Sequence, residues 1–242
     1  MKSTFVELAM HLAIVLPLIL LTLTNRKGET LKIVAVFALY FLMHGLLLYL
    51  PTEFNVLRLT NGNWNWSGKV YALLGSLLFL ALYRKFDLKD YFLTLKQHKD
   101  FLKHGLIAIF VIFVLKGLFN VLYLSPTEWD MESLLFQATM PGLDEEIAFR
   151  GIMLGLLTKI LRPGKRAIFH PAIYVTALLF GMAHGLYLND SFELSFNISS
   201  LLITAVMGVA WAWMTLKSGS ILMALVSHYL GNVTSQVISM WK

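Results

Sequence analysis

Eight stretches of mostly apolar residues follow one another along the chain, and no other feature restricts its fold as strongly. They cover residues 5–24, 31–50, 66–83, 104–125, 139–160, 171–187, 197–216 and 219–237. A helix crosses the hydrocarbon core of a bilayer in about 20 residues, which is close to the length of each stretch. We therefore predict an all-α fold, a polytopic bundle of about eight transmembrane helices in an integral membrane protein.

The composition excludes whole classes of protein. Hydrophobic residues make up 57% of the 242 residues and charged residues only 14%, whereas soluble domains have about 45–50% and about 25%, so a water-soluble enzyme is excluded. The chain has no cysteine, which excludes disulfides, cysteine-ligated metals and a thiol nucleophile. The net charge of +6 is expected to set membrane orientation, and nucleic acid is not an expected partner.

Lysine and arginine are divided unequally between alternate loops, which is the pattern that sets membrane topology. One group of loops holds most of them: Arg26, Lys27, Lys32, Arg84, Lys85, Lys89, Lys96, Lys99, Lys103, Lys159, Arg162, Lys165, Arg166 and Lys217. The opposite group has few cations, among them Lys69, and carries the acidic residues Glu128, Asp130, Glu132, Asp190 and Glu193. Because cytoplasmic loops carry the excess of Lys and Arg, we predict that both termini lie outside the cytoplasm.

The chain has no internal repeat and no long linker, so we predict one structural domain with two regions. Residues 1–134 would supply four spans and a cytoplasmic amphipathic segment at about 87–103, and residues 135–237 would supply four further spans. In the charged segment, apolar residues recur at helical spacing, which favours an amphipathic helix on the membrane surface: Leu88, Tyr91, Phe92 and Leu95. A solvated connector is the alternative.

Ionisable residues inside apolar stretches are candidates for function, because a charge is costly in hydrocarbon. Glu146 and Arg150 are four residues apart in the fifth stretch, so they can pair on one helix face. Glu145 points about 100° away from Glu146 and has no cation three or four residues from it. An unpaired carboxylate in an apolar site is suited to accept and donate protons near neutral pH, so we predict a catalytic role for Glu145.

Two histidines and an asparagine add to this set. His228 and Asn232 are four residues apart in the eighth stretch, and His184 lies in the sixth. The four-residue spacing points His228 and Asn232 toward the same neighbour, and both can donate hydrogen bonds. In the predicted topology, these three residues and Glu145 lie roughly 5 to 14 Å below the outer ends of their helices. All four can therefore meet in one layer of the bundle.

Lys116 lies near the middle of the fourth stretch, so it needs a route to water or a carboxylate partner. Asp144 and Glu146 are the candidate partners, and we expect structural pairing rather than catalysis. The sequence assigns no role to Asp144. Close helix contacts are expected where small residues repeat at four-residue spacing: Gly151 with Gly155, and Gly181 with Gly185.

Three ordered motifs resemble those of a known family. They stand as Glu145-Glu146-x-x-x-Arg150, Phe180-x-x-x-His184 and His228-x-x-x-Asn232, within residues 135–236. They are similar to the EExxxR, FxxxH and HxxxN motifs of the CPBP, or Abi, intramembrane proteases, which include the type II CAAX prenyl proteases and bacteriocin-processing enzymes. The sequence contains no HExxH, GxSxG or P-loop motif, so the usual zinc-protease, serine-hydrolase and NTPase signatures are absent.

The resemblance implies an eight-helix intramembrane endopeptidase, in a bacterial cell membrane, that hydrolyses a peptide bond with activated water. It implies that Glu145 is the general base, that His184 helps to hold the water, and that His228 and Asn232 donate hydrogen bonds to the oxyanion. It further implies that Glu146 and Arg150 orient and balance the first carboxylate.

The resemblance leaves the role of a metal open, since the family has been described both as metalloproteases and as glutamate-dependent hydrolases. Glu145, His184 and His228 could ligate zinc with a water in the fourth position. In that case Glu146, which is tied to Arg150, would be the only obvious base. We therefore favour a mechanism with no metal or other cofactor.

The expected partner is a peptide or protein substrate in or at the lipid bilayer, with a role in bacteriocin maturation or self-immunity. Prenylated CAAX proteins are cleaved from the cytosolic side, whereas the predicted topology places the site in the outer half of the bilayer. Either the topology is inverted, or the substrate is an exported or membrane-embedded peptide. The alternatives are a noncatalytic membrane scaffold or immunity protein that binds a partner, and a transporter or proton relay, for which no inverted halves are visible. Oligomeric state is not indicated.

Overall fold

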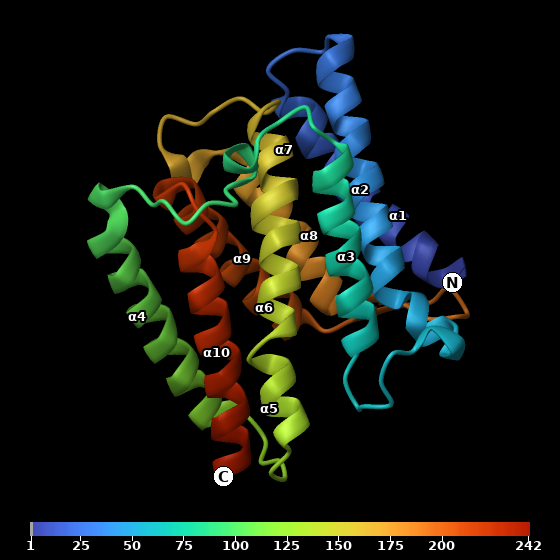
Figure 1. The fold of residues 1–242 in the computed structure, drawn as a ribbon, viewed down its shortest axis with the longest axis vertical. Coiled ribbons are helices and arrows are strands. Elements are labelled where there is room, and N and C mark those ends of the chain that lie inside the picture. The colour runs from blue at the N-terminus through green and yellow to red at the C-terminus, as the bar shows by residue number, and fades with distance from the viewer. Residues whose placement is uncertain (1) are drawn as a thin grey trace.

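The first half of the chain forms four long helices. The structure, a computed structural model, describes residues 2–242. The helices are α1 (Lys2–Thr22), α2 (Gly28–Glu53), α3 (Trp66–Leu82) and α4 (Lys99–Tyr123), with short 3-10 helices η1 (Asn55–Leu57) and η2 (Leu88–Tyr91) in the connections. Figure 1 shows α1, α2 and α3 together on one side of the molecule and α4 on the opposite side.

The second half of the chain forms the centre of the bundle and its remaining helices. The short helix α5 (Met131–Gln137) precedes one continuous helical run composed of α6 (Met140–Glu145), the π-helical segment η3 (Glu146–Met153) and α7 (Leu154–Thr158). The remaining elements are η4 (Ala167–Phe169), α8 (Pro171–Gly185), β1 (Leu186–Leu188), β2 (Leu194–Phe196), α9 (Ile198–Ser218) and α10 (Leu222–Trp241).

The all-α prediction is confirmed, with a long helical segment near each of the eight predicted stretches. Four helices are long and apolar enough to cross a membrane, namely α1, α2, α4 and α9, and α3 and α8 are shorter apolar helices. The run from α6 to α7 lies in the middle of the bundle, between α3 and α10 (Figure 1). A residue on this run can therefore be reached from several other helices.

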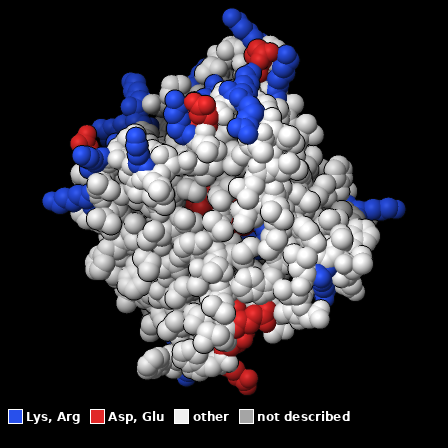
Figure 2. All heavy atoms as spheres, viewed as in Figure 1, with Lys and Arg blue, Asp and Glu red and all other residues white. Residues whose placement is uncertain are grey.

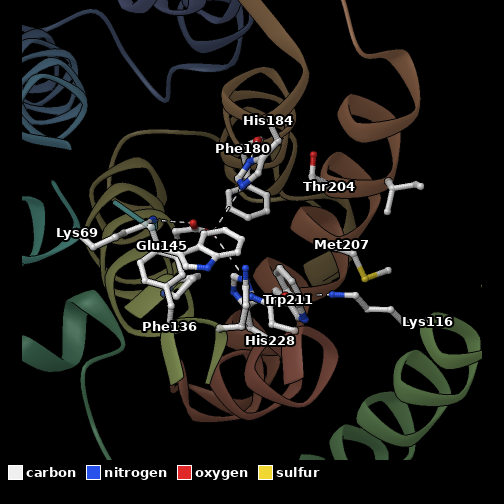
Figure 3. A pocket seen from close by; sticks show the side chains of 15 residues that line it. Lys69, Lys116, Phe136, Glu145, Phe180, His184, Thr204, Met207, Trp211 and His228 are labelled. Atoms are coloured by element: carbon white, nitrogen blue, oxygen red, sulfur yellow. Dashed lines mark hydrogen bonds and ion pairs between the residues drawn. The ribbon is translucent and has the colours of Figure 1, made fainter. Parts of the chain in front are cut away.

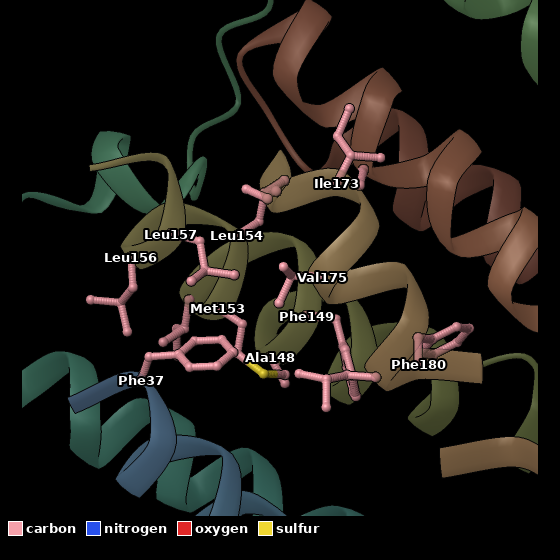
Figure 4. Packing of buried hydrophobic residues seen from close by; sticks show 14 of the residues in the cluster. Phe37, Ala148, Phe149, Met153, Leu154, Leu156, Leu157, Ile173, Val175 and Phe180 are labelled. Carbon is pink, nitrogen blue, oxygen red and sulfur yellow. The ribbon is translucent and has the colours of Figure 1, made fainter. Parts of the chain in front are cut away.

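The core is built around the central run. Met153 and Leu157 of that run are completely buried, as is Ile173 of α8. They belong to the cluster of buried hydrophobic residues drawn in Figure 4, in which Phe37 of α2 lies beside Met153. Side chains from both halves of the chain therefore share this core.

The amphipathic helix predicted for residues 87–103 is wrong. An Asp87–Asp90 capping box starts only the four-residue helix η2, and Phe92 ends it in the left-handed conformation with φ 57°. Tyr91 is buried at 1% exposure while Leu95 is 83% exposed, so the apolar side chains do not share one face. The segment is a connector anchored inward at Tyr91, and the helical spacing of its apolar residues was coincidental.

Two small elements near the acidic loops were not expected. Asp130 accepts hydrogen bonds from the backbone N–H groups of Glu132 and Ser133, so it caps α5 at its N-terminus. The strands β1 and β2 pair antiparallel, with Tyr187 opposite Ser195. Both elements lie at helix ends next to the site described below.

Glycines hold α8 and α9 in close contact, as the spacing of Gly181 and Gly185 predicts. A Cβ on Gly185 would lie 2.6 Å from the Asn197 carbonyl oxygen and from the Leu201 nitrogen of α9. The other glycine pair does not meet a long helix, because Gly155 lies against the backbone of η2, with the Asp90 carbonyl oxygen 2.7 Å from its added Cβ.

Gly185→Ala is expected to destabilise the protein by about 1–3 kcal/mol, because the new methyl group meets backbone atoms that cannot move aside independently. Titration of the detergent-solubilised protein with SDS, followed by circular dichroism, measures the change. Gly117→Ala in α4 is the matched control, since nothing lies within 4 Å of its added Cβ. Equal stability of the two variants would show that α8 and α9 can separate without cost.

The two ends of the bundle differ in charge, as the alternation of the loops predicts. The loop after α1 is joined to the loop after α7, because Thr24 N–H donates to the Ile160 carbonyl, and His98 N–H donates to the Ser218 carbonyl at the end of α9. Figure 2 shows Lys and Arg gathered at this end and acidic residues at the opposite end. At the basic end, Lys159 lies 2.6 Å from Asp90 and lowers the pKa of that carboxyl.

Candidate active site

Three helices bring one carboxylate and two imidazoles together. Glu145, the last residue of α6, has its Oε2 atom 3.9 Å from His184 Nε2 of α8 and 3.8 Å from His228 Nε2 of α10. Figure 3 shows these three side chains around one cavity. The structure thus brings together residues that are far apart in the sequence, of which Glu145 and His228 are 83 positions apart.

Each histidine is oriented by a hydrogen bond from its other ring nitrogen. His184 Nδ1 lies 2.8 Å from the Phe180 carbonyl oxygen, and His228 Nδ1 lies 2.8 Å from Glu146 Oε1. A carbonyl and a carboxylate oxygen can only accept, so both Nδ1 atoms carry hydrogen. In the neutral rings, Nε2 is then left with a lone pair that faces Glu145.

Arg150 and Glu146 form a buried layer behind the histidines. Arg150 NH1 lies 3.2 Å from Glu146 Oε1, and neither side chain is more than 1% exposed. The Arg150 guanidinium also lies over the Phe180 ring, 4.1 Å from its centroid. The indole of Trp211 stacks on His228 with ring centroids 4.2 Å apart. This layer fixes His228 from two sides. Glu146 and Arg150 both lie in the π-helical segment η3, and π-helical turns are often found at functional sites.

Glu145 is not the unpaired carboxylate that the sequence predicts. Lys69 of α3 lies with its ammonium 2.7 Å from Glu145 Oε1 and 3.0 Å from Asp144 Oδ2, and His44 Nε2 of α2 lies 3.0 Å from Asp144 Oδ1. The prediction considered only cations on the same helix, so it missed a partner supplied by another one.

The signal for Lys69 and His44 was present in the sequence. Both residues lie inside predicted apolar stretches, which marks them as functional candidates by the rule applied to Glu145. Its position close to the start of its stretch instead groups Lys69 with the cations of the outer loops. Asp144, which had no assigned role, is the residue that connects them: it is completely buried and contacts both.

Lys116 does not pair with a carboxylate, and that prediction is wrong. Its ammonium lies 3.1 Å from Asn232 Oδ1. An ammonium can only donate, so the oxygen of the Asn232 amide faces Lys116 and the amide NH2 is left as a donor. Lys116 also lines the cavity, where it faces Lys69 from the opposite side (Figure 3). All six predicted site residues and these two lysines therefore lie at one site.

The cavity next to these residues has a volume of about 320 Å³; we call it the large cavity. Glu145, His184, His228 and Asn232 line it, together with both lysines. The remaining wall is mostly apolar and comes from α5, α6, α8, α9 and the α2–α3 connection: Trp64, Phe136, Pro141, Phe180, Ile203, Met207 and Trp211. Trp64 stacks on Phe136, with centroids 4.9 Å apart, and donates a hydrogen bond to Ser133.

A polar opening continues from the large cavity toward the acidic end. It is a hollow of about 530 Å³ that shares Trp64, Gln137 and Asn232 with the large cavity. Its own lining includes Glu128 and Asp130. The two hollows together therefore lead from the acidic end to Glu145 and Asn232.

The residues fit a zinc ion poorly. Among the residues that the structure describes, no group of three His, Asp or Glu side chains is arranged to hold a metal. The Lys69 ammonium is 2.7 Å from Glu145, so a divalent cation on this carboxylate would lie close to a positive charge that is already in place. The same contacts suit a water molecule that is held between Glu145 and the two imidazoles.

The comparison with protein families identifies the part of the chain that contains the predicted site residues. Residues 127–234 match the family model described as type II CAAX prenyl endopeptidase Rce1-like. The match includes all six predicted site residues but not α1 to α4, so Lys69, His44 and Lys116 lie outside it. Searches among curated proteins and among solved structures give no match. Over residues 127–234, the chain is therefore similar to the type II CAAX prenyl endopeptidases of the Rce1-like family.

Proposed function

We propose that the protein is an endopeptidase that cleaves a membrane-associated peptide or protein with a water molecule activated by Glu145 and His184. The observation that carries the proposal is the meeting of Glu145, His184 and His228 at 3.8–3.9 Å on the wall of a cavity that also presents Asn232. A base and two donors around one space are what hydrolysis of an acyl group requires.

The proposed reaction needs no covalent intermediate. Glu145 Oε2 takes a proton from the water while the Nε2 atom of His184 helps to hold it, and the water oxygen bonds to the peptide carbonyl carbon. Glu145 then gives the proton to the leaving nitrogen as the C–N bond breaks. The products are a carboxylic acid and an amine, so the atoms of one water are divided between them.

The oxyanion of the tetrahedral intermediate is stabilised by two donors. The Asn232 amide NH2 is free for this role because Lys116 holds the amide oxygen. His228 can donate from Nε2 only as an imidazolium, since its Nδ1 hydrogen is already directed to Glu146. Glu146 and Arg150 lie behind the ring and hold it in this orientation. Lys69 keeps Glu145 turned toward the histidines by holding its other oxygen.

Asn232→Ala is expected to lower kcat by about 10²- to 10³-fold, the range seen when one oxyanion donor is removed. The measurement is the rate of peptide cleavage by purified variants at saturating substrate. Gln236→Ala, one helical turn further along α10 and on the wall of the polar opening, is the control, and we expect it to retain kcat. A normal kcat in Asn232→Ala would remove this residue from the mechanism.

We propose that the substrate enters from the non-cytoplasmic side of a bacterial cell membrane and is an exported or membrane-embedded peptide, as in bacteriocin maturation or self-immunity. The support is the polar opening at the acidic end, opposite the basic loops. A topology reporter fused at Lys242 tests the orientation. Activity of a reporter that works only in the cytoplasm would reverse it and favour a cytosolic, CAAX-like substrate.

The experiment that tests the proposed function is cleavage of a mixed panel of prenylated, plain and membrane-embedded peptides by the detergent-purified protein, read by mass spectrometry. Cleavage at one bond class identifies the substrate chemistry. A parallel arm with a chelator, together with metal analysis of protein purified without one, tests the metal-free mechanism. Stoichiometric zinc that tracks activity would overturn that part of the proposal, and a folded protein that cleaves none of the panel would count against peptidase activity.

A further inference from the structure

A second, smaller cavity lies behind the catalytic carboxylate. Its volume is about 90 Å³, and we call it the small cavity. Leu8 and His11 of α1 line it, together with residues of α2 and α8: Phe41, His44, Gly45, Leu48, Tyr49, Ala183 and His184. Most of this wall therefore comes from helices that lie outside the family match.

The large and small cavities share a wall made of catalytic groups. Lys69, Glu145 and His184 line both of them. Of these two cavities, only the large one is lined by His228 and Asn232. The oxyanion donors therefore face one side of Glu145 alone, and the peptide carbonyl must lie on that side.

One residue in the wall of the small cavity, His11, has a polar atom with no partner among the described residues. His11 is completely buried, and its Nε2 lies 3.1 Å from the Leu186 carbonyl oxygen. This nitrogen must donate, so in the neutral ring Nδ1 is an acceptor, and Nδ1 has no hydrogen-bond partner. A buried acceptor without a partner is costly, so this wall of the small cavity is not purely apolar.

The space and polarity of the small cavity suit several waters. One buried water needs a cavity of about 10–15 Å³ measured with a water-sized probe, and two to four polar partners. The cavity exceeds that volume several-fold at about 90 Å³ and is lined by His11, His44, Tyr49, Lys69 and Glu145. Tyr49 lies near the C-terminal end of α2, so the cavity extends toward the acidic end of the bundle.

A bound peptide makes a separate water supply necessary. When substrate fills the large cavity, it covers the approach from the polar opening to Glu145. We propose that the small cavity holds a pool of water that supplies the hydrolytic water to Glu145 and His184 from the side opposite the peptide. This inference rests on the proposed function, and it assigns to α1 and α2 a part in catalysis that the family region alone does not provide.

Radiolytic hydroxyl-radical footprinting of the detergent-purified protein tests whether the small cavity is wet. Radicals formed from bound water modify adjacent side chains even where bulk solvent does not reach. Phe41 lines the cavity and is 3% exposed, whereas Phe37 lies one helical turn away in the core at 1% exposure. We expect Phe41 to be modified at least about fivefold faster than Phe37. Equally slow modification of both would show a dry cavity and overturn the proposal.

Ala183→Leu tests whether that water is used. The larger side chain fills the small cavity from α8, and we expect kcat to fall about tenfold with KM within twofold, together with loss of the Phe41 modification. Ala210→Leu in α9 is the matched control, because Ala210 is half-buried and lines neither cavity. Normal kcat in Ala183→Leu with Phe41 no longer modified would overturn the supply role. If the wild-type protein cleaves no peptide, the proposed function fails with the supply role, while the Phe41 result still decides whether the cavity holds water.

Discussion

Glu145→Gln is expected to lower kcat for peptide cleavage by about 10²- to 10⁴-fold, the contribution of a positioned general base, while the protein remains folded. Glutamine has the same size and keeps an oxygen that can accept the hydrogen bond from Lys69, which lies 2.7 Å from Glu145 in the native protein. Asp144 remains as a carboxylate partner for this lysine at 3.0 Å. What the variant loses is the ability to take a proton from water.

The measurement is a comparison of kcat and KM for wild type and Glu145→Gln on a peptide from the panel, with size-exclusion and circular dichroism profiles as the check of folding. Glu193→Gln, at an exposed carboxylate of β-hairpin residues 186–196, is the control for loss of one negative charge and should retain both constants. Full cleavage by Glu145→Gln would show that another residue is the general base. Retained biological function in the absence of any cleavage would favour a binding scaffold.

The helices could be predicted because each depends on a local property. A run of apolar residues with the length of the bilayer forms a helix whatever its neighbours are, so the eight predicted stretches lie close to the observed helices. The site residues of the second half could also be found, since a four-residue spacing such as that of His228 and Asn232 places both on one face. Their meeting with Glu145 and His184 follows from the charge-derived depths.

The partners of Glu145 could not be found from spacing, because they depend on which helices are neighbours. Lys69 contacts Glu145 only because α3 packs against α6, and Lys116 contacts Asn232 only because α4 packs against α10. The amphipathic helix predicted at residues 87–103 was wrong for the same reason. The burial of Tyr91 against Gly155 outweighs the helical spacing of the apolar residues. Local sequence pattern does not predict the structure where tertiary contacts determine it.

The two halves of the chain contribute different residues to the site. Residues 127–234 carry the proposed base, the proposed oxyanion donors and the buried layer behind them. The helices of the first half contribute the two lysines that orient Glu145 and Asn232, as well as most of the wall of the small cavity. A fragment that contains only the family region would therefore keep the catalytic side chains but lose the groups that hold them in place.

Arg150→Ala should cause the largest loss of stability of any single change at the site, about 3–5 kcal/mol. The substitution leaves Glu146, whose side chain is 0% exposed, without the guanidinium 3.2 Å away, and an uncompensated buried charge is costly to this extent. It also removes the contact of the guanidinium with the Phe180 ring at 4.1 Å. The free energy of unfolding is measured by SDS titration in detergent, with Arg84→Ala at an exposed position as the control, expected within about 0.5 kcal/mol of wild type.

A double variant that also removes the charge of Glu146 separates the cost of the uncompensated carboxylate from the cost of the lost packing. In Arg150→Met/Glu146→Gln, methionine fills part of the space and no uncompensated carboxylate remains, so the double variant should be more stable than Arg150→Ala by about 2 kcal/mol or more, since the buried charge is the larger part of the cost. His228 keeps an acceptor for Nδ1 in the glutamine oxygen, yet a neutral amide oxygen is a weaker acceptor than a carboxylate and holds the ring less firmly. We therefore expect a stable protein with low kcat. Equal stability of the two variants would mean that the stacking of Arg150 on Phe180, and not the ion pair, holds this layer together.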